Sequence, residues 1–213
     1  MAPTVVLITG ANRGIGRGLL ELYLARPAHT VIAAVRDPDH ATARELAALP
    51  RHVSGTTSLV VTKLDLTVAS DPAAAAANLA ARHGVRHVDV LVANAGIALM
   101  WVGVAEVTPE DMQRHVDVNV HGFVRLFQAF RPVLKAAEKP KWVTIGSSAA
   151  VLTVSLSCCF CLDSLQSGLA DVVLRSESPR FPLLRVAHVI PSSVRCLGEL
   201  LGLSPRRCFL LSC

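Results

Sequence analysis

A chain of 213 residues, of which 52% are hydrophobic, is long enough to bury the core of one domain. The formal net charge is +5, but the 21 Lys and Arg residues form no basic stripe, which disfavours a nucleic-acid-binding protein. The N-terminal residues run without a basic region into the apolar stretch 5–8, so the sequence predicts no signal peptide and a cytoplasmic location. The charge-free stretch 142–162 contains Gly146 and several hydroxyl side chains, which favours a buried strand and loop over a membrane span.

Up to residue 146, short β-branched runs alternate with longer helical patterns, as is typical of βαβ units. The predicted strands are residues 5–9, 31–35, 59–64, 88–93 and 142–145. The predicted helices are residues 15–25, 41–48, 72–82 and 109–137. For the third helix, Asp71 is the expected N-cap and Pro72 the expected first helical residue. We therefore expect an α/β fold with a Rossmann-type, doubly wound parallel sheet of strand order 3-2-1-4-5.

A glycine-rich turn, Thr9-Gly10-Ala11-Asn12-Arg13-Gly14-Ile15-Gly16, lies between the first predicted strand and the first predicted helix. Gly10 permits a tight turn, Gly14 lets the backbone approach a pyrophosphate, and Gly16 lets the helix pack closely on the strand. The helix N-terminus adds free N–H groups for the phosphates. A purely structural turn is the alternative. The candidate cofactor-binding residues of this turn are Thr9, Gly10, Asn12, Arg13, Gly14, Ile15 and Gly16.

The spacing Thr-Gly-x-x-x-Gly-x-Gly resembles the short-chain dehydrogenase/reductase family, and four further matches follow in the family's order. The resemblance implies that Asp65 contacts the adenine ring and that Asn94-Ala95-Gly96 borders the nicotinamide ribose. It also implies catalytic roles for Asn119 and Ser147, with Ser148 as an alternative one position later. Taken singly, each residue has an ordinary explanation as a cap, turn or strand-end residue. Within the family, the sequence most resembles fungal ketoreductases of the norsolorinic acid ketoreductase type.

The second predicted strand ends in Val35-Arg36-Asp37, where such proteins distinguish their cofactors. An arginine at this point pairs with a 2′-phosphate, and Arg13 offers a second guanidinium nearby. The sequence therefore predicts NADP(H). The alternative is NAD(H), selected by Asp37 as an acceptor for the ribose hydroxyl.

The general acid of the family, a Tyr with a Lys four residues later, has no counterpart in this sequence. Tyr23 is the only tyrosine, and the last lysine is Lys141, ahead of the fifth predicted strand. His121 and His188 have suitable acidity for proton donation but are more simply structural histidines. The sequence therefore predicts an impaired or inactive catalyst.

The composition changes after residues 1–150, the predicted dinucleotide-binding domain. Residues 151–213 hold all six cysteines, and only 183–190 suggests a further strand. Cys158-x-x-Cys161 has no second ligand pair, so no metal site is expected. We interpret this tail as atypical for the family, and a retained intron or a shifted reading frame in the gene model as its origin.

Two functional hypotheses follow. The first is an NADP(H)-dependent carbonyl or keto reductase, by family resemblance. The apolar stretch 97–104 would then line a pocket for a small hydrophobic carbonyl or alcohol substrate. The second is a dinucleotide-binding module without turnover, which the missing Tyr and Lys favour. The sequence assigns no oligomeric state, membrane or nucleic-acid partner.

Overall fold

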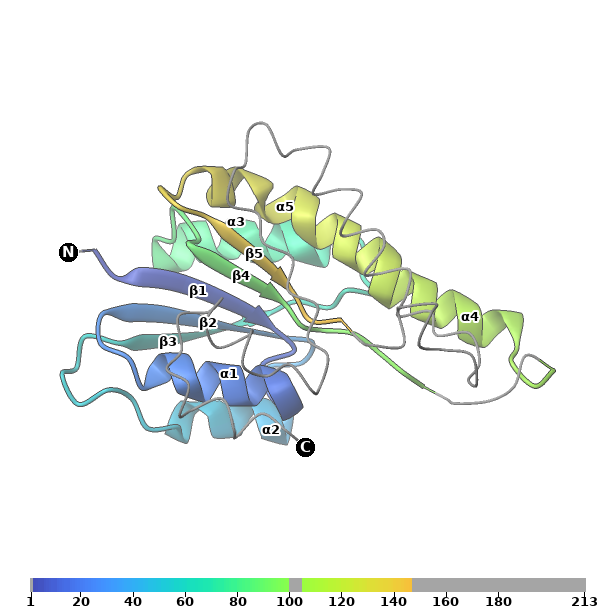
Figure 1. Cartoon of the computed structure of the whole chain (residues 1–213), viewed down its shortest axis with the longest axis horizontal. Helices are drawn as coiled ribbons and strands as arrows, with labels where there is room; N and C mark the ends of the chain where they lie inside the picture. The colour runs from blue at the N-terminus through green and yellow to red at the C-terminus, as the bar shows by residue number, and fades with distance from the viewer. Residues whose placement is uncertain (1, 100–104, 147–213) are drawn as a thin grey trace.

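The computed structural model describes residues 2–99 and 105–146. Within them, five parallel strands form one sheet in the order β3-β2-β1-β4-β5, which confirms the predicted topology (Figure 1). The strands are β1 (Thr4–Thr9), β2 (His29–Val35), β3 (Ser58–Lys63), β4 (Val90–Ala93) and β5 (Lys141–Thr144). Each predicted strand is present, with ends shifted by one or two residues.

The helices lie on both faces of the sheet, with α1 and α2 on one face and α3 and α5 on the other (Figure 1). They are α1 (Gly14–Leu24), α2 (Ala41–Arg44), α3 (Asp71–His83), α4 (Pro109–His115) and α5 (Phe123–Lys135). A 3₁₀ turn, Glu45–Ala48, continues α2, and a π-helical segment, η2 (Val116–Gly122), joins α4 to α5. The helix predicted over 109–137 is therefore one helical run with a change of hydrogen-bond pattern in its middle.

The buried core consists of two apolar layers separated by the sheet. Side chains of a strand alternate between its faces, so Leu7 packs toward α3 and α5 whereas Val6 and Ile8 pack toward α1. In the first layer, Trp142 of β5 is fully buried, and α5 contributes two phenylalanines with edge-to-face ring contacts to it. Because both faces are covered, the strands are apolar almost throughout, as is typical of parallel sheets.

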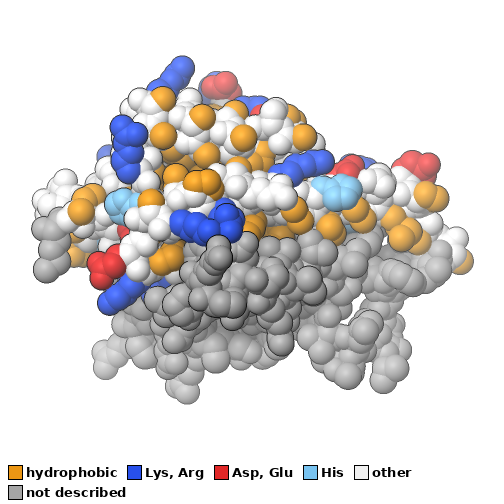
Figure 2. Space-filling view, turned by 90° about the horizontal axis from the view of Figure 1, so that it is seen from above, with side chains coloured by type: hydrophobic (Ala, Val, Ile, Leu, Met, Phe, Trp, Pro, Cys, Tyr) orange, Lys and Arg blue, Asp and Glu red, His pale blue; other side chains and the backbone are white. Residues whose placement is uncertain are grey.

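The surface carries scattered charges. On the face that Figure 2 shows, Lys and Arg side chains lie singly among hydrophobic and neutral ones and form no continuous stripe. Among residues 2–99 and 105–146, no helix is both long and apolar enough to cross a membrane.

The start of α3 differs from the prediction by one residue. The helix begins at Asp71 itself, Ser70 takes the N-cap position without a side-chain capping bond, and Pro72 follows as the second helical residue. The Asp71 carboxylate does not cap its own helix because it faces the end of β3. There it accepts hydrogen bonds from the Asp65 backbone N–H at 3.0 Å and from Lys63 Nζ at 2.8 Å.

Candidate cofactor site

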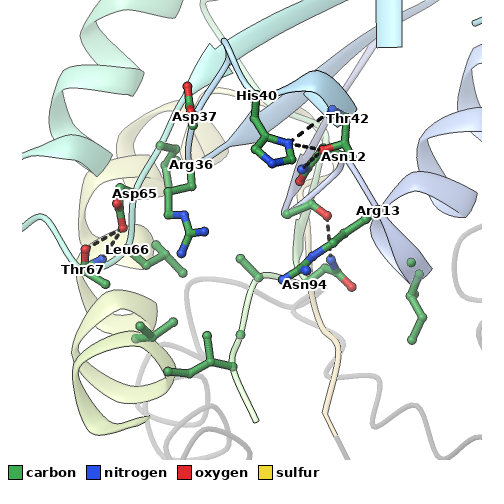
Figure 3. A pocket seen from close by; sticks show the side chains of 18 residues that line it. Asn12, Arg13, Arg36, Asp37, His40, Thr42, Asp65, Leu66, Thr67 and Asn94 are labelled. Atoms are coloured by element: carbon green, nitrogen blue, oxygen red, sulfur yellow. Dashed lines mark hydrogen bonds between the residues drawn. The ribbon is translucent and has the colours of Figure 1, made fainter. Parts of the chain in front are cut away.

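A cleft of about 570 Å³ lies at the carboxyl ends of the strands, where the predicted site was expected (Figure 3). From β1 the chain continues to β2 and β3 on one side of the sheet and then crosses to β4 and β5 on the other side, so the strand order reverses at β1. Open α/β sheets bind ligands at such a switch point. Most of the predicted cofactor residues line this cleft, namely Gly10, Asn12, Arg13, Gly14, Ile15, Arg36, Asp65, Asn94, Ala95 and Gly96. Thr9 and Gly16 do not line the cleft themselves, but they contact Gly10, Asn94 and Ala95, which do.

The glycine-rich turn is shaped by two different requirements. Gly14 has a φ of +54° and no atom within 4 Å of the place where a Cβ would stand, so its side toward the cleft is open. At Gly16, a Cβ would collide with the Gly10 carbonyl and would stand 2.6 Å from Asn94 Nδ2. Gly16 thus permits the close approach of α1 to β4, in addition to the predicted contact with β1.

Thr9 and Asn94 connect the two strands that border the cleft. The Thr9 hydroxyl accepts hydrogen bonds from the backbone N–H groups of Asn94 at 3.0 Å and Ala95 at 2.9 Å, and donates to the Val92 carbonyl. Asn94 Nδ2 in turn donates to the Thr9 carbonyl at 2.9 Å. Both side chains make hydrogen bonds to backbone groups of the protein itself, so they hold the glycine-rich turn against the end of β4.

The first turn of α1 has free backbone donors at the cleft. Arg13 occupies the N-cap position with an extended backbone and makes no side-chain capping bond. The N–H groups of the first turn have no partner within a helix, and here Gly14 and Ile15 line the cleft. This arrangement fits an anionic group such as a pyrophosphate.

Two arginines reach into the cleft from different elements. Figure 3 shows the guanidinium groups of Arg36, after β2, and Arg13, before α1, pointing toward the middle of the cleft. Neither makes an ion pair with any carboxylate of the described ranges. Asp37 stands at the rim with its side chain turned away, and its Oδ1 accepts a hydrogen bond from the Asp39 backbone N–H at 2.9 Å.

Asp65 lies at the edge of the cleft in a tight local turn. Its Oδ1 accepts hydrogen bonds from the backbone N–H of Thr67 at 2.9 Å and from the Thr67 hydroxyl at 2.7 Å (Figure 3). Its own backbone N–H is held by Asp71, whose pKa the neighbouring Lys63 ammonium lowers from its ordinary value. The Asp71 carboxylate therefore ties the loop after β3 to the start of α3.

Substituting Asp71 by Asn should lower the free energy of unfolding by about 1 kcal/mol at pH 7. The pKa of Asp71 is depressed in the folded state, so its contribution is present above the ordinary Asp pKa of about 3.9 and is lost as the pH falls. Urea denaturation of both proteins should show a difference at pH 7 that shrinks below pH 4. A difference that grows toward acid pH would contradict this assignment.

Asn119 has its side chain fully buried in the π-helical segment, away from the cleft lining. Its Oδ1 accepts from the Ile97 backbone N–H and its Nδ2 donates to the Ile97 carbonyl, both at 2.9 Å. The segment also packs tightly on the loop after β3, because a Cβ at Gly122 would stand 2.6 Å from Leu66 Cβ. π-Helical turns are frequent at functional sites, and this one positions the loops after β3 and β4 together.

Two histidines of the helical run 109–135 make hydrogen bonds within the protein. His115 is buried; its Nε2 accepts from the Leu99 backbone N–H at 3.0 Å and its Nδ1 contacts the Asp111 carbonyl at 2.7 Å. It was not predicted, and it gives the loop after β4 a second anchor one helical turn from Asn119. His121 is half exposed and pairs with Asp117 outside the cleft.

Other predicted residues lie outside the described ranges. These are Ser147, Ser148, His188, the candidate strand 183–190, all six cysteines and residues 151–213 as a whole. Of the apolar stretch 97–104, the structure describes 97–99, and Ile97 lines the cleft. Tyr23 is buried in α1, where burial raises the pKa of its phenol to about 12.

The cleft also contains residues that the motifs did not indicate, namely His40, Thr42, Leu64, Leu66, Thr67 and Val118. Most of them come from the loops after β2 and β3, where a sequence pattern gives no periodic signal. Behind the cleft, Gly122 had a usable signal, because an isolated glycine inside a helical pattern indicates close packing.

A parallel sheet covered on both faces, with a glycine-rich turn at its topological switch point, defines a Rossmann-type dinucleotide-binding protein. The family described as short chain dehydrogenase matches residues 4–161, somewhat beyond the predicted boundary at 150. The chain therefore belongs to the short-chain dehydrogenase family, whose members bind nicotinamide dinucleotides.

Individual relatives agree with this membership. A norsolorinic acid ketoreductase from Dothistroma septosporum is 41% identical over 157 residues, which cover 73% of this chain and 58% of that protein. The norsolorinic acid ketoreductase of Emericella nidulans is 39% identical over 155 residues, with 73% and 58% covered. The NADPH-bound carbonyl reductase from chicken fatty liver superposes with a TM-score of 0.77 at 28% identity, covering 90% of this chain and 80% of that one. The chain thus spans somewhat more than half the length of these ketoreductases.

Proposed function

We propose that the cleft binds NADP(H) and that the chain acts on carbonyl or alcohol groups as a reductase of this family. The bound cofactor supplies the hydride, and the protein binds and orients the reactants. The observation that carries the cofactor choice is the opposite orientation of Arg36 and Asp37. The guanidinium of Arg36 faces the cleft, whereas the carboxylate of Asp37 is turned away and engaged by the Asp39 backbone.

The charge at this end of the cleft supports a phosphate over a bare hydroxyl. Arg36 and Arg13 approach from two elements, and a planar guanidinium can donate two parallel hydrogen bonds to phosphate oxygens. The pyrophosphate would be held by the N–H groups of Gly14 and Ile15. Asp65 and Leu66 at the neighbouring edge are the candidates for contact with the adenine ring.

An apolar carbonyl compound is the proposed substrate class. Ile97 and Val118 provide apolar surface at the β4 end of the cleft, and Leu99 nearby is 42% exposed. The names of the fungal relatives, ketoreductases of norsolorinic acid, agree with a ketone substrate. The catalytic assignment of Ser147 remains part of this proposal, with Asn119 as a positioning residue that holds the Ile97 backbone.

A second candidate function, dinucleotide binding without turnover, is favoured by the state of the only tyrosine. Tyr23, on the buried side of α1, is 2% exposed, and its raised pKa makes it a poor proton donor near neutral pH. NADPH oxidation with a panel of ketones and aldehydes, run beside a direct titration of NADPH, distinguishes the two functions. Binding without oxidation supports the second.

Arg36→Asp should raise the dissociation constant of NADPH by about 10- to 100-fold, because a charged hydrogen bond contributes about 1.5–3 kcal/mol. NADH binding should change little or improve. Fluorescence titration of both cofactors measures the two dissociation constants. Arg44→Asp makes the same charge change on α2, where the side chain is 70% exposed and outside the cleft. Equal losses of NADPH affinity in the two variants, or no loss in Arg36→Asp, would refute NADP(H) as the ligand of this cleft.

A further inference from the structure

His40 lines the same end of the cleft as Arg36, and its contacts determine which ring nitrogen carries the proton. The backbone N–H of Thr42 lies 3.3 Å from Nδ1, and the Thr42 hydroxyl lies 2.9 Å from the same atom. A backbone N–H can only donate, so Nδ1 is the acceptor. In a neutral imidazole the proton then resides on Nε2.

Asn12 reinforces this arrangement from the glycine-rich turn. Its Nδ2 donates to the Thr42 hydroxyl at 2.6 Å, so that the hydroxyl is free to direct its own hydrogen at His40 Nδ1 (Figure 3). The donors thus run in one direction, from Asn12 through Thr42 to His40. A proton on Nδ1 would face the Thr42 N–H and disrupt this sequence, so the arrangement favours the proton on Nε2.

The other ring nitrogen of His40 faces the cleft, on the side toward the guanidinium groups of Arg36 and Arg13 (Figure 3). Among the described residues it has no hydrogen-bond acceptor. The acids on its own loop are engaged elsewhere, Asp37 with the Asp39 backbone and Asp39 with Arg44. A fixed N–H donor beside two cations is arranged for an anion.

We propose that His40 is a third contact for the 2′-phosphate of NADP(H), donating from Nε2. It therefore contributes to selectivity for NADPH over NADH. This inference rests on the proposed function, because it assumes that the cleft binds a dinucleotide with its adenosine end at Arg36.

A matched pair of histidines provides the test. His52 makes the same local contacts, with Ser54 donating its N–H to Nδ1 at 3.2 Å and its hydroxyl 2.8 Å away, but it lies outside the cleft. His40→Asn and His52→Asn each keep a side chain that can accept from the backbone and remove the Nε2–H. Dissociation constants for NADPH and NADH are measured for both variants and for Arg36→Asp.

His40→Asn should raise the dissociation constant of NADPH about tenfold and leave that of NADH unchanged, whereas His52→Asn should change neither. Equal losses for NADPH and NADH in His40→Asn would show a purely structural role and overturn the inference. If Arg36→Asp loses NADPH selectively but His40→Asn does not, the inference fails while the proposed function stands. If neither variant discriminates, both fail.

Discussion

The 213-residue chain should bind NADPH yet reduce carbonyl compounds roughly 10²–10⁴-fold more slowly than family members that have the Tyr and Lys pair. The residues proposed for binding are present in the cleft, whereas a phenol of lowered pKa is absent from the sequence. Reduction leaves an alkoxide that needs a positioned proton donor, and water reaches the site without the required placement or acidity. Stopped-flow and steady-state NADPH oxidation with a panel of ketones would measure the deficit.

Replacing residues 152–213 with a family segment that carries Tyr-x-x-x-Lys should raise the rate of carbonyl reduction by the missing factor of roughly 10²–10⁴. A second graft, identical except for Phe in place of its Tyr, serves as the control and should lose the gain while binding NADPH equally well. An ordinary rate from the unmodified chain, on the order of 10 s⁻¹, would mean that another residue donates the proton. The proposal of a missing general acid would then be wrong.

Asn119→Leu should destabilise the protein by about 2–6 kcal/mol, because it leaves both the N–H and the carbonyl of Ile97 without partners, each costing about 1–3 kcal/mol. That loss is a large fraction of the stability of a typical domain, about 5–15 kcal/mol. Denaturant titration measures the loss, and amide hydrogen exchange at Ile97 reports the local effect.

The removal of an exposed amide of the same helical run provides the comparison for Asn119. Gln113 donates to Asp117 on the surface of α4, and Gln113→Leu should cost less than about 0.5 kcal/mol. A loss below this value in Asn119→Leu, with unchanged exchange at Ile97, would contradict the role of Asn119 as the anchor of the loop after β4.

The alternation of apolar strands with helical patterns predicted the parallel sheet, and the glycine-rich turn after its first strand, typical of Rossmann-type proteins, indicated the strand order. Parallel strands buried on both faces must be apolar throughout, and the connections between them are helical and right-handed, so few topologies are compatible with this pattern. The glycine-rich turn was predictable for a similar local reason, since backbone conformation and close approach at Gly14 and Gly16 depend on the absence of a side chain.

Helix ends and hydrogen-bond types were less predictable. The stretch 109–137 has one continuous periodicity, so the sequence does not indicate the π-helical segment Val116–Gly122. That segment forms where Asn119 satisfies the backbone of Ile97 and Gly122 meets Leu66, which are contacts between segments distant in the chain. Asp71 similarly accepts from Lys63 and the Asp65 backbone instead of capping its own helix, which begins at Asp71 itself.

By itself, the sequence determined the fold class, the strand order and the elements that meet at the cleft, since these depend on local propensity and on burial. Only the tertiary structure decided which side chains face the cleft and what they can donate. Arg36 and Asp37 are adjacent in the chain and both were candidate cofactor contacts, with Arg36 favoured; in the structure Asp37 accepts from the Asp39 backbone N–H and Arg36 is directed inward. The tautomer of His40 is likewise reinforced by Asn12, a residue from another loop, whose hydrogen bond to Thr42 exists only after folding.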